Sequence, residues 1–197
     1  MAQDTHAVTH VMVDIETLGT APGSAILSIG AVAFDPFTEV LGEEAEWHIS
    51  LHSCTAAGLT MDPSTLLWWL EQSDAARAAT FKGRGAGNRL LFVLQEFSGW
   101  LSSVRSLYAP RIWAHGASFD PILLDAAYRA VGEKAPWDFR DLRDTRTIFD
   151  LAGISSLAEY RCANDVHHSA LSDAKVQARA VGDAYRLLGL VKPEVAA

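Results

Sequence analysis

The segment Val11–Thr17 reads Val-Met-Val-Asp-Ile-Glu-Thr and places two carboxylates at the end of an apolar run. Side chains alternate between the faces of a strand, so Asp14 and Glu16 point to one face and Ile15 between them points to the other. Two adjacent anions beside a buried strand are costly unless a cation neutralises them. A hard divalent ion such as Mg²⁺ prefers oxygen ligands of this kind. The segment fits a metal site, or a strand that ends in a solvated acidic turn.

The chain has 197 residues, which is the size of one ordinary domain with a sizeable core. We expect a single domain over residues 1–197, with its core from about 9 to 190 and short flexible termini. No secretory leader pattern and no run long enough to span a bilayer is found, so we expect no membrane contact and a cytoplasmic location. Cys54 and Cys162 lie outside any metal-ligand spacing and are expected to be reduced thiols.

The net charge of −8 and the pI near 5.3 argue against a protein that coats nucleic acid with a broad basic face. They do not exclude an enzyme that reaches one phosphate at a time through bound metal. If nucleic acid is the substrate, the absence of a basic stripe favours short strands or unpaired ends.

Four strands are expected from the apolar runs and the turn residues between them. Residues 9–16, 25–34 and about 46–51 form an antiparallel meander, and the middle strand is central because it is apolar on both faces. Residues 111–115 form a short buried strand. Since helices and strands alternate after the meander, we expect an α/β protein in which helices flank a mixed sheet.

The helices are expected from apolar residues at helical spacing. Asp62 is a predicted N-cap and Pro63 the first helical residue of one of them. The expected helices cover residues 62–72, 88–104, 119–131, 141–151 and 169–188. The glycines in 82–87 are spaced somewhat like a phosphate-binding loop, but no strand precedes them, so we interpret this segment as a flexible solvated loop.

Two further acidic positions lie downstream of the first segment. Asp120 falls at a helix start, where an acid usually complements the helix dipole, and Asp173 follows His168 by five residues. A histidine before a helix is often only a capping or solvated residue. Together with Asp14 and Glu16, however, these residues resemble the motifs of the DEDD superfamily of 3′–5′ exonucleases, in its His-containing DEDDh branch.

Three segments carry this resemblance. Asp14–Thr17 resembles the first motif, His115–Asp120 (His-Gly-Ala-Ser-Phe-Asp) the second, and His168–Asp173, a His-x₄-Asp, the third. Their order and separation agree with the superfamily from about Val11 to Leu188.

Within the superfamily, one subgroup shares more than the three motifs. Asp-Ile-Glu-Thr-Leu-Gly at 14–19, the pair Trp68 and Trp69, and the segment Arg143–Thr147 are similar to the small mycobacterial-type exoribonucleases, phage exonuclease A and the nuclease part of exonuclease VIII. Gly116 departs from the pattern, because many DEDDh enzymes have asparagine there.

The resemblance implies an RNase H-like fold of about five strands, the first three an antiparallel meander. It implies two Mg²⁺ ions about 4 Å apart, for which Mn²⁺ can substitute. The expected metal ligands are four carboxylates, those of Asp14, Glu16, Asp120 and Asp173. It also implies that His168 is the general base, since a neutral imidazole accepts a proton near pH 7.

Family analogy further implies contacts with the substrate. Thr17 and Leu18 would lie against the terminal nucleotide, with Leu18 near its base. Phe119 either stacks on a base or packs within the second motif, and Trp69 is either a stacking surface or a core residue.

Two arginines one helical turn apart are open to two interpretations. Arg143 and Arg146 either contact phosphate, or pair with Asp141 and Asp150 in the expected helix.

The expected function is a metal-dependent 3′–5′ exonuclease acting on the 3′ ends of single-stranded or overhanging RNA or DNA and releasing 5′-mononucleotides. One alternative is a catalytically silent nucleic-acid-binding module of the same fold, which the intact carboxylates disfavour. Another is a small phosphatase or nucleotide hydrolase, which the motif order disfavours. The subgroup also makes a homodimer plausible.

Overall fold

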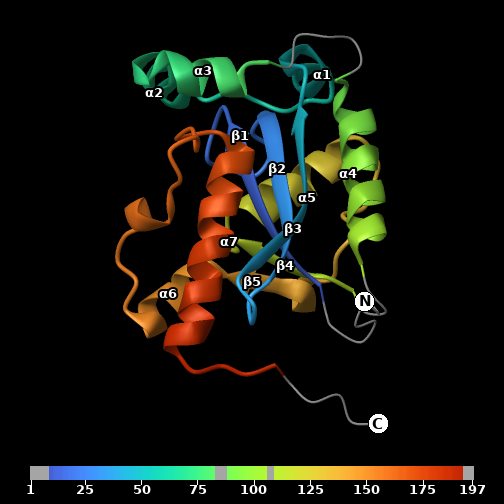
Figure 1. The fold of residues 1–197 in the computed structure, drawn as a ribbon. Coiled ribbons are helices and arrows are strands. Elements are labelled where there is room, and N and C mark those ends of the chain that lie inside the picture. Colours follow the sequence, from blue (N-terminus) through green and yellow to red (C-terminus); the bar gives the residue numbers. More distant parts are fainter. Residues whose placement is uncertain (1–8, 83–87, 106–108, 193–197) are drawn as a thin grey trace.

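A five-stranded sheet forms the centre of the protein, which we describe from a computed structural model covering residues 9–82, 88–105 and 109–192 (Figure 1). The strands are β1 (His10–Thr17), β2 (Ile26–Asp35), β3 (Val40–His48), β4 (Arg111–Ala114) and β5 (Leu142–Asp144). Their order is β3-β2-β1-β4-β5, with the first three antiparallel and β1, β4 and β5 parallel. This confirms the expected mixed sheet with an antiparallel meander.

As expected, β2 is an interior strand, because it lies between β3 and β1, and its residues from Ile26 to Phe34 are all buried. The prediction for the third strand is wrong in its bounds: the strand covers Val40–His48 rather than about 46–51, and residues 51–56 form a helix. β3 is an edge strand with an exposed acidic segment, Glu43-Glu44. An edge strand of this kind lacks the apolar run that marks a buried one.

Seven α-helices and two short 3₁₀ helices occur in the described part of the chain. They are α1 (Leu51–Ala56), α2 (Pro63–Glu71), α3 (Asp74–Thr80), α4 (Leu90–Val104), α5 (Asp120–Ala130), α6 (Thr145–Ala152), α7 (Ala170–Leu187), η1 (Phe139–Asp141) and η2 (Ala158–Tyr160). Four predicted helices agree to within two residues at each end, and Asp62 caps α2 by accepting from the backbone of Ser64 and Thr65. Within the region described, none of the helices is both long and apolar enough to cross a membrane.

The helix expected over 141–151 is wrong in its first half, where the edge strand β5 lies instead. Asp144 ends that strand and caps α6, because its side chain accepts the backbone N–H of Arg146 at 2.9 Å. Helices α1 and α3 were not predicted. The N-terminal residues 1–8, which belong to the termini expected to be flexible, and most of the glycine-rich loop, residues 83–87, lie outside the described residues.

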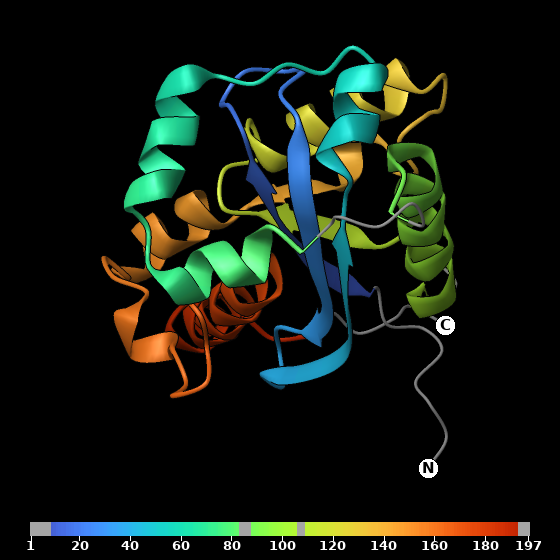
Figure 2. The ribbon, with the colours of Figure 1, turned by 90° about the horizontal axis from the view of Figure 1, so that it is seen from above.

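Helices cover both faces of the sheet (Figures 1 and 2). Helices α6 and α7 pack on one face, and α4 and α5 pack on the other. Along β1, Val13 and Ile15 belong to the core beneath α4 and α5, whereas Met12 belongs to the core beneath α7. Because side chains alternate along a strand, Asp14 and Glu16 lie on the α7 side, where the site is built.

Candidate active site

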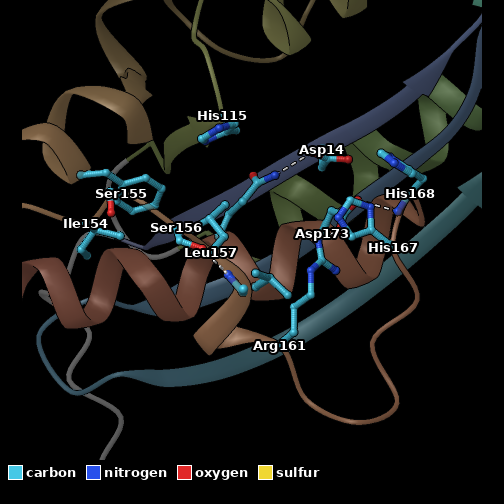
Figure 3. A pocket seen from close by; sticks show the side chains of 14 residues that line it. Asp14, His115, Ile154, Ser155, Ser156, Leu157, Arg161, His167, His168 and Asp173 are labelled. Atoms are coloured by element: carbon cyan, nitrogen blue, oxygen red, sulfur yellow. Dashed lines mark hydrogen bonds and ion pairs between the residues drawn. The ribbon is translucent and has the colours of Figure 1, made fainter.

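Three carboxylates meet where β1 approaches its end. Asp14 and Glu16 come from β1 and Asp173 from the first turn of α7, and each offers a ligand oxygen within 4.8 Å of the other two. The close-up in Figure 3 shows Asp14 and Asp173 near each other among the residues that line one pocket. The cluster therefore brings together Asp14 and Asp173, which are 159 positions apart in the sequence.

A glycine makes this convergence possible. Gly30 pairs with Asp14 in the β1–β2 register, and α7 begins directly above it. A Cβ atom at this position would lie 2.2 Å from the carbonyl carbon of Ala170 and 2.2 Å from the nitrogen of Leu171, which is closer than van der Waals contact allows. Only glycine lets the start of α7 lie this near to the sheet and so bring Asp173 to Asp14.

Asp120 approaches the same place from α5. Its side chain is 3% exposed, and its Oδ1 accepts the backbone N–H of Ile15 at 3.2 Å. β4 pairs with β1 only as far as Met12, so this N–H lies beyond that pairing. Asp120 is not one of the three carboxylates within 4.8 Å, but its negative charge raises the pKa of both Asp14 and Glu16.

The crowded acids have raised pKa values. Burial raises the pKa of Glu16 to about 8, with further contributions from the charges of Asp173 and Asp120. Burial and neighbouring carboxylates raise the pKa of Asp14 well above its usual value, although the Gln177 amide opposes the shift. Burial also raises the pKa of Asp120 to about 7, against the effect of its backbone hydrogen bonds. Such a cluster ionises fully only when a cation compensates it, so these residues fit a divalent metal site.

The structure adds two polar side chains that the sequence reasoning missed. Gln177 lies one helical turn after Asp173, and its Nε2 donates to Asp14 Oδ1 at 2.8 Å. Arg161, from the loop before α7, donates to Asp173 Oδ1 at 2.7 Å. Helical spacing on α7 could have identified Gln177, whereas nothing in the sequence around Arg161 signalled its partner.

His168 lies between the carboxylates and helix α2. Its backbone has a left-handed φ of +58°, and its N–H donates to Asp173 Oδ2 at 3.0 Å. Its carbonyl accepts from Thr80 Oγ1 at 2.9 Å, and its ring centroid is 4.9 Å from that of Trp68 and 4.2 Å from that of His167. Burial, followed by the neighbouring His167, lowers the pKa of His168, which favours a neutral ring near pH 7.

A second cavity of about 480 Å³ lies beside the first motif, and Thr17, Trp68 and the half-buried Phe119 are among its lining residues. Leu18 is 0% exposed, so in this conformation it supports the turn rather than facing a ligand. Trp69 is 1% exposed and donates its indole N–H to the carbonyl of Thr17 at 2.9 Å, which agrees with the core interpretation of this residue. Trp68, for which the sequence analysis expected no contact with the substrate, is the exposed ring at 41%.

Of the two interpretations of Arg143 and Arg146, pairing with Asp141 and Asp150 is not seen among the described residues. Asp141 pairs with Arg111 at 2.6 Å, and Arg143 donates to two backbone carbonyls. Arg146 forms no ion pair with any residue described, and its guanidinium carbon lies 3.5 Å from the place where a Cβ of Gly116 would be. Gly116 has φ +115°, a conformation suited to glycine, and this accounts for the departure noted in the second motif.

Comparisons with known proteins agree with this geometry. Residues 9–184 match the family described as 3′-5′ exoribonuclease Rv2179c-like domain, and no curated protein matches. The nuclease domain of 3′hExo, a DEDDh family member bound to rAMP, superposes with a TM-score of 0.62 at 12% identity, covering 93% of this chain and 94% of that one. E. coli exonuclease I with a dT13 oligonucleotide gives 0.59 at 16%, covering 93% and 41%. A full-length 3′-exonuclease gives 0.56 at 12%, covering 90% and 81%.

These structural similarities establish the RNase H-like fold of the DEDDh exonucleases. The chain spans less than half the length of exonuclease I, so the activity of that whole enzyme does not carry over directly.

Proposed function

Because the chain belongs to the family of Rv2179c-like 3′–5′ exoribonuclease domains, we propose that it removes 5′-mononucleotides from the 3′ ends of single-stranded or overhanging RNA or DNA. The observation that carries this proposal is the set of three carboxylates whose oxygens lie within 4.8 Å, formed by β1 and α7. Crowded acids with raised pKa values are costly in a structure without a cation, and this cost marks them as functional.

Two Mg²⁺ ions, or Mn²⁺ in their place, fit this cluster. The proposed ligands are Asp14, Glu16 and Asp173, with Asp120 completing the set. When bound, the ions supply an activated water and stabilise charge on the leaving oxygen. Four carboxylates balance four positive charges, so the loaded site can still accept an anionic phosphodiester.

His168 is the proposed general base. Its lowered pKa keeps the ring available to accept a proton from water near pH 7. The hydrogen bond from its backbone N–H to Asp173 ties its position to a metal ligand. His167 is exposed and forms the outer neighbour of this ring. The four-residue spacing to Asp173 also favours His168.

The cavity beside Thr17 is the proposed site of the terminal nucleotide. Trp68 and Phe119 supply ring surface for the base, and Thr17 supplies the adjoining turn. Leu18 lies beneath this surface, and the nearly buried Trp69, which also lines the cavity, holds the Thr17 carbonyl through its indole N–H. The structure of 3′hExo contains rAMP and that of E. coli exonuclease I contains dT13, so both RNA and DNA are proposed substrates here.

End-labelled strands test the proposal. We expect 5′-labelled single-stranded RNA or DNA with Mg²⁺ to give a ladder of products shortened from the 3′ end, and EDTA to abolish it. Circular single strands should survive, and a 3′-phosphate should slow the reaction. Rapid cleavage of circles would reveal an endonuclease, and turnover of free nucleotides alone would favour a nucleotide hydrolase. The expected single domain over residues 1–197, the homodimer and the cytoplasmic location stay predictions.

A further inference from the structure

Arg161 holds a position in the site that the proposed chemistry does not use. We propose that Arg161 is a phosphate-positioning residue: it pairs with Asp173 while the carboxylates lack metal, and it transfers to the phosphate of the bound nucleotide once they are loaded. This inference rests on the proposed nuclease function.

The first observation is where the side chain lies. Arg161 directly follows η2, and its Nη2 lies 2.7 Å from Asp173 Oδ1. Its side chain is 23% exposed and lines a cavity of about 670 Å³ together with Asp14, His168 and Gln177 (Figure 3). The guanidinium is therefore inside the chamber that a phosphodiester must enter to reach the carboxylates.

The second observation is an unused donor. Nη1 of Arg161 is buried and has no hydrogen-bond partner among the residues described. Buried polar groups in proteins are normally satisfied, and an unpaired buried donor costs free energy. A guanidinium presents its donors as a planar fork that matches two phosphate oxygens. Once the guanidinium leaves Asp173 and turns toward the cavity, a phosphate there would supply the acceptor that Nη1 lacks.

Arg179 shows what a structural arginine looks like in the same region. Its Nη1 pairs with Asp165 at 2.6 Å and also donates to the carbonyl of Tyr160 at 3.1 Å. Arg161 and Arg179 each form an ion pair that connects α7 with the segment before it. Arg179, however, does not line the cavity. Arg179 is the matched control.

The contacts of Asp173 explain why Arg161 must change partner. Its Oδ1 accepts from Arg161 and its Oδ2 accepts from the backbone of His168, so both oxygens are engaged. A metal ion that takes Asp173 as a ligand competes with Arg161 for Oδ1. The displaced guanidinium stays beside the neutralised site and adds a positive charge that attracts an incoming phosphate.

Binding measurements without turnover test this inference. We would titrate Mn²⁺ by calorimetry into Arg161→Met, Arg161→Lys, Arg179→Met and the unaltered protein, and then titrate AMP and adenosine into each at saturating Mn²⁺. For Arg161→Met we expect Mn²⁺ affinity to be unchanged or higher, because a competing cation is gone. AMP affinity should fall about 10- to 100-fold, the effect of one charge-assisted contact, with adenosine affinity unchanged.

The controls separate positioning from folding. Arg161→Lys should retain part of the AMP affinity, and Arg179→Met should leave the ratio of AMP to adenosine affinity as in the unaltered protein. Equal losses of AMP and adenosine, or a lower Mn²⁺ affinity in both Arg161 variants, would assign Arg161 a structural role and overturn the inference. If the unaltered protein binds neither Mn²⁺ nor AMP and degrades no strand, the proposed nuclease function fails as well.

Discussion

Replacing Asp14 by Asn should stabilise the protein in the absence of metal while abolishing cleavage. The substitution removes one charge from the cluster and preserves an oxygen that can still accept from Gln177. Two unit charges 4.8 Å apart, the outer limit for this cluster, repel by about 3.5 kcal/mol at an effective dielectric constant of about 20. Bound protons already relieve part of this repulsion, so we expect a realised gain of about 1–2 kcal/mol.

The gain should depend on pH in a defined direction. The pKa of Glu16 is about 8 in the folded protein, above its usual 4.5, so the folded state binds more protons than the unfolded state between these values. Without metal, the stability of the unaltered protein therefore falls as the pH rises through this window. The advantage of Asp14→Asn should be small near pH 5 and largest near pH 8, about 2–8 °C in Tm.

Thermal melting in EDTA at pH 5 and pH 8 measures this effect, and Mn²⁺ calorimetry measures the accompanying loss of metal affinity. Asp150→Asn, a change at an exposed position on α6, is the control and should show neither effect. If Asp14→Asn folds but melts no higher than the unaltered protein at either pH, the inferred repulsion between Asp14 and the neighbouring carboxylates is refuted. If it cleaves strands normally, the two-metal proposal is refuted.

Three further substitutions address other parts of the site. His168→Ala should lower kcat about 10²- to 10⁴-fold and flatten the acidic limb of the pH–rate profile, with little change in Mn²⁺ affinity. His167→Ala should keep that limb. The reverse pattern would show that the third motif is assigned one residue away from its true position. Gly30→Ala should destabilise the fold by about 1–3 kcal/mol and weaken Mn²⁺ binding in calorimetry, while Gly99→Ala, where a Cβ meets nothing within 4 Å, should do neither. Trp68→Ala should weaken AMP binding by about tenfold or more with little loss of Tm, and an unchanged AMP titration would exclude stacking on this ring.

The parts of the site that could be predicted from the sequence are those fixed by local geometry. Strand alternation alone places Asp14 and Glu16 on one face, and the structure has them there. The helix boundaries around Asp120 and Asp173 follow from apolar spacing, so Asp120 was correctly placed at a helix start and Asp173 within the last helix.

The rest depended on tertiary contacts. Trp68 and Trp69 are neighbours of the same type, and only the docking of α2 against the carbonyl of Thr17 decides which ring is buried. β5 has three residues, too few for a periodic pattern, and it is a strand because β4 pairs with it. Arg161 meets Asp173 because the loop before α7 turns back over the cavity, and sequence spacing does not report such a turn.

The close contact at Gly30 also has a consequence for the order in which the enzyme becomes active. Asp14 and Glu16 are made early in synthesis, whereas Asp173 and Gln177 come from α7, the last helix described. Until α7 packs onto Gly30, the site lacks Asp173, one of its four proposed metal ligands, and Gln177, the donor to Asp14. We therefore expect cleavage only after α7 has packed onto the sheet. The proposed metal would in turn stabilise the packed position of α7, because only that position supplies Asp173 as a ligand.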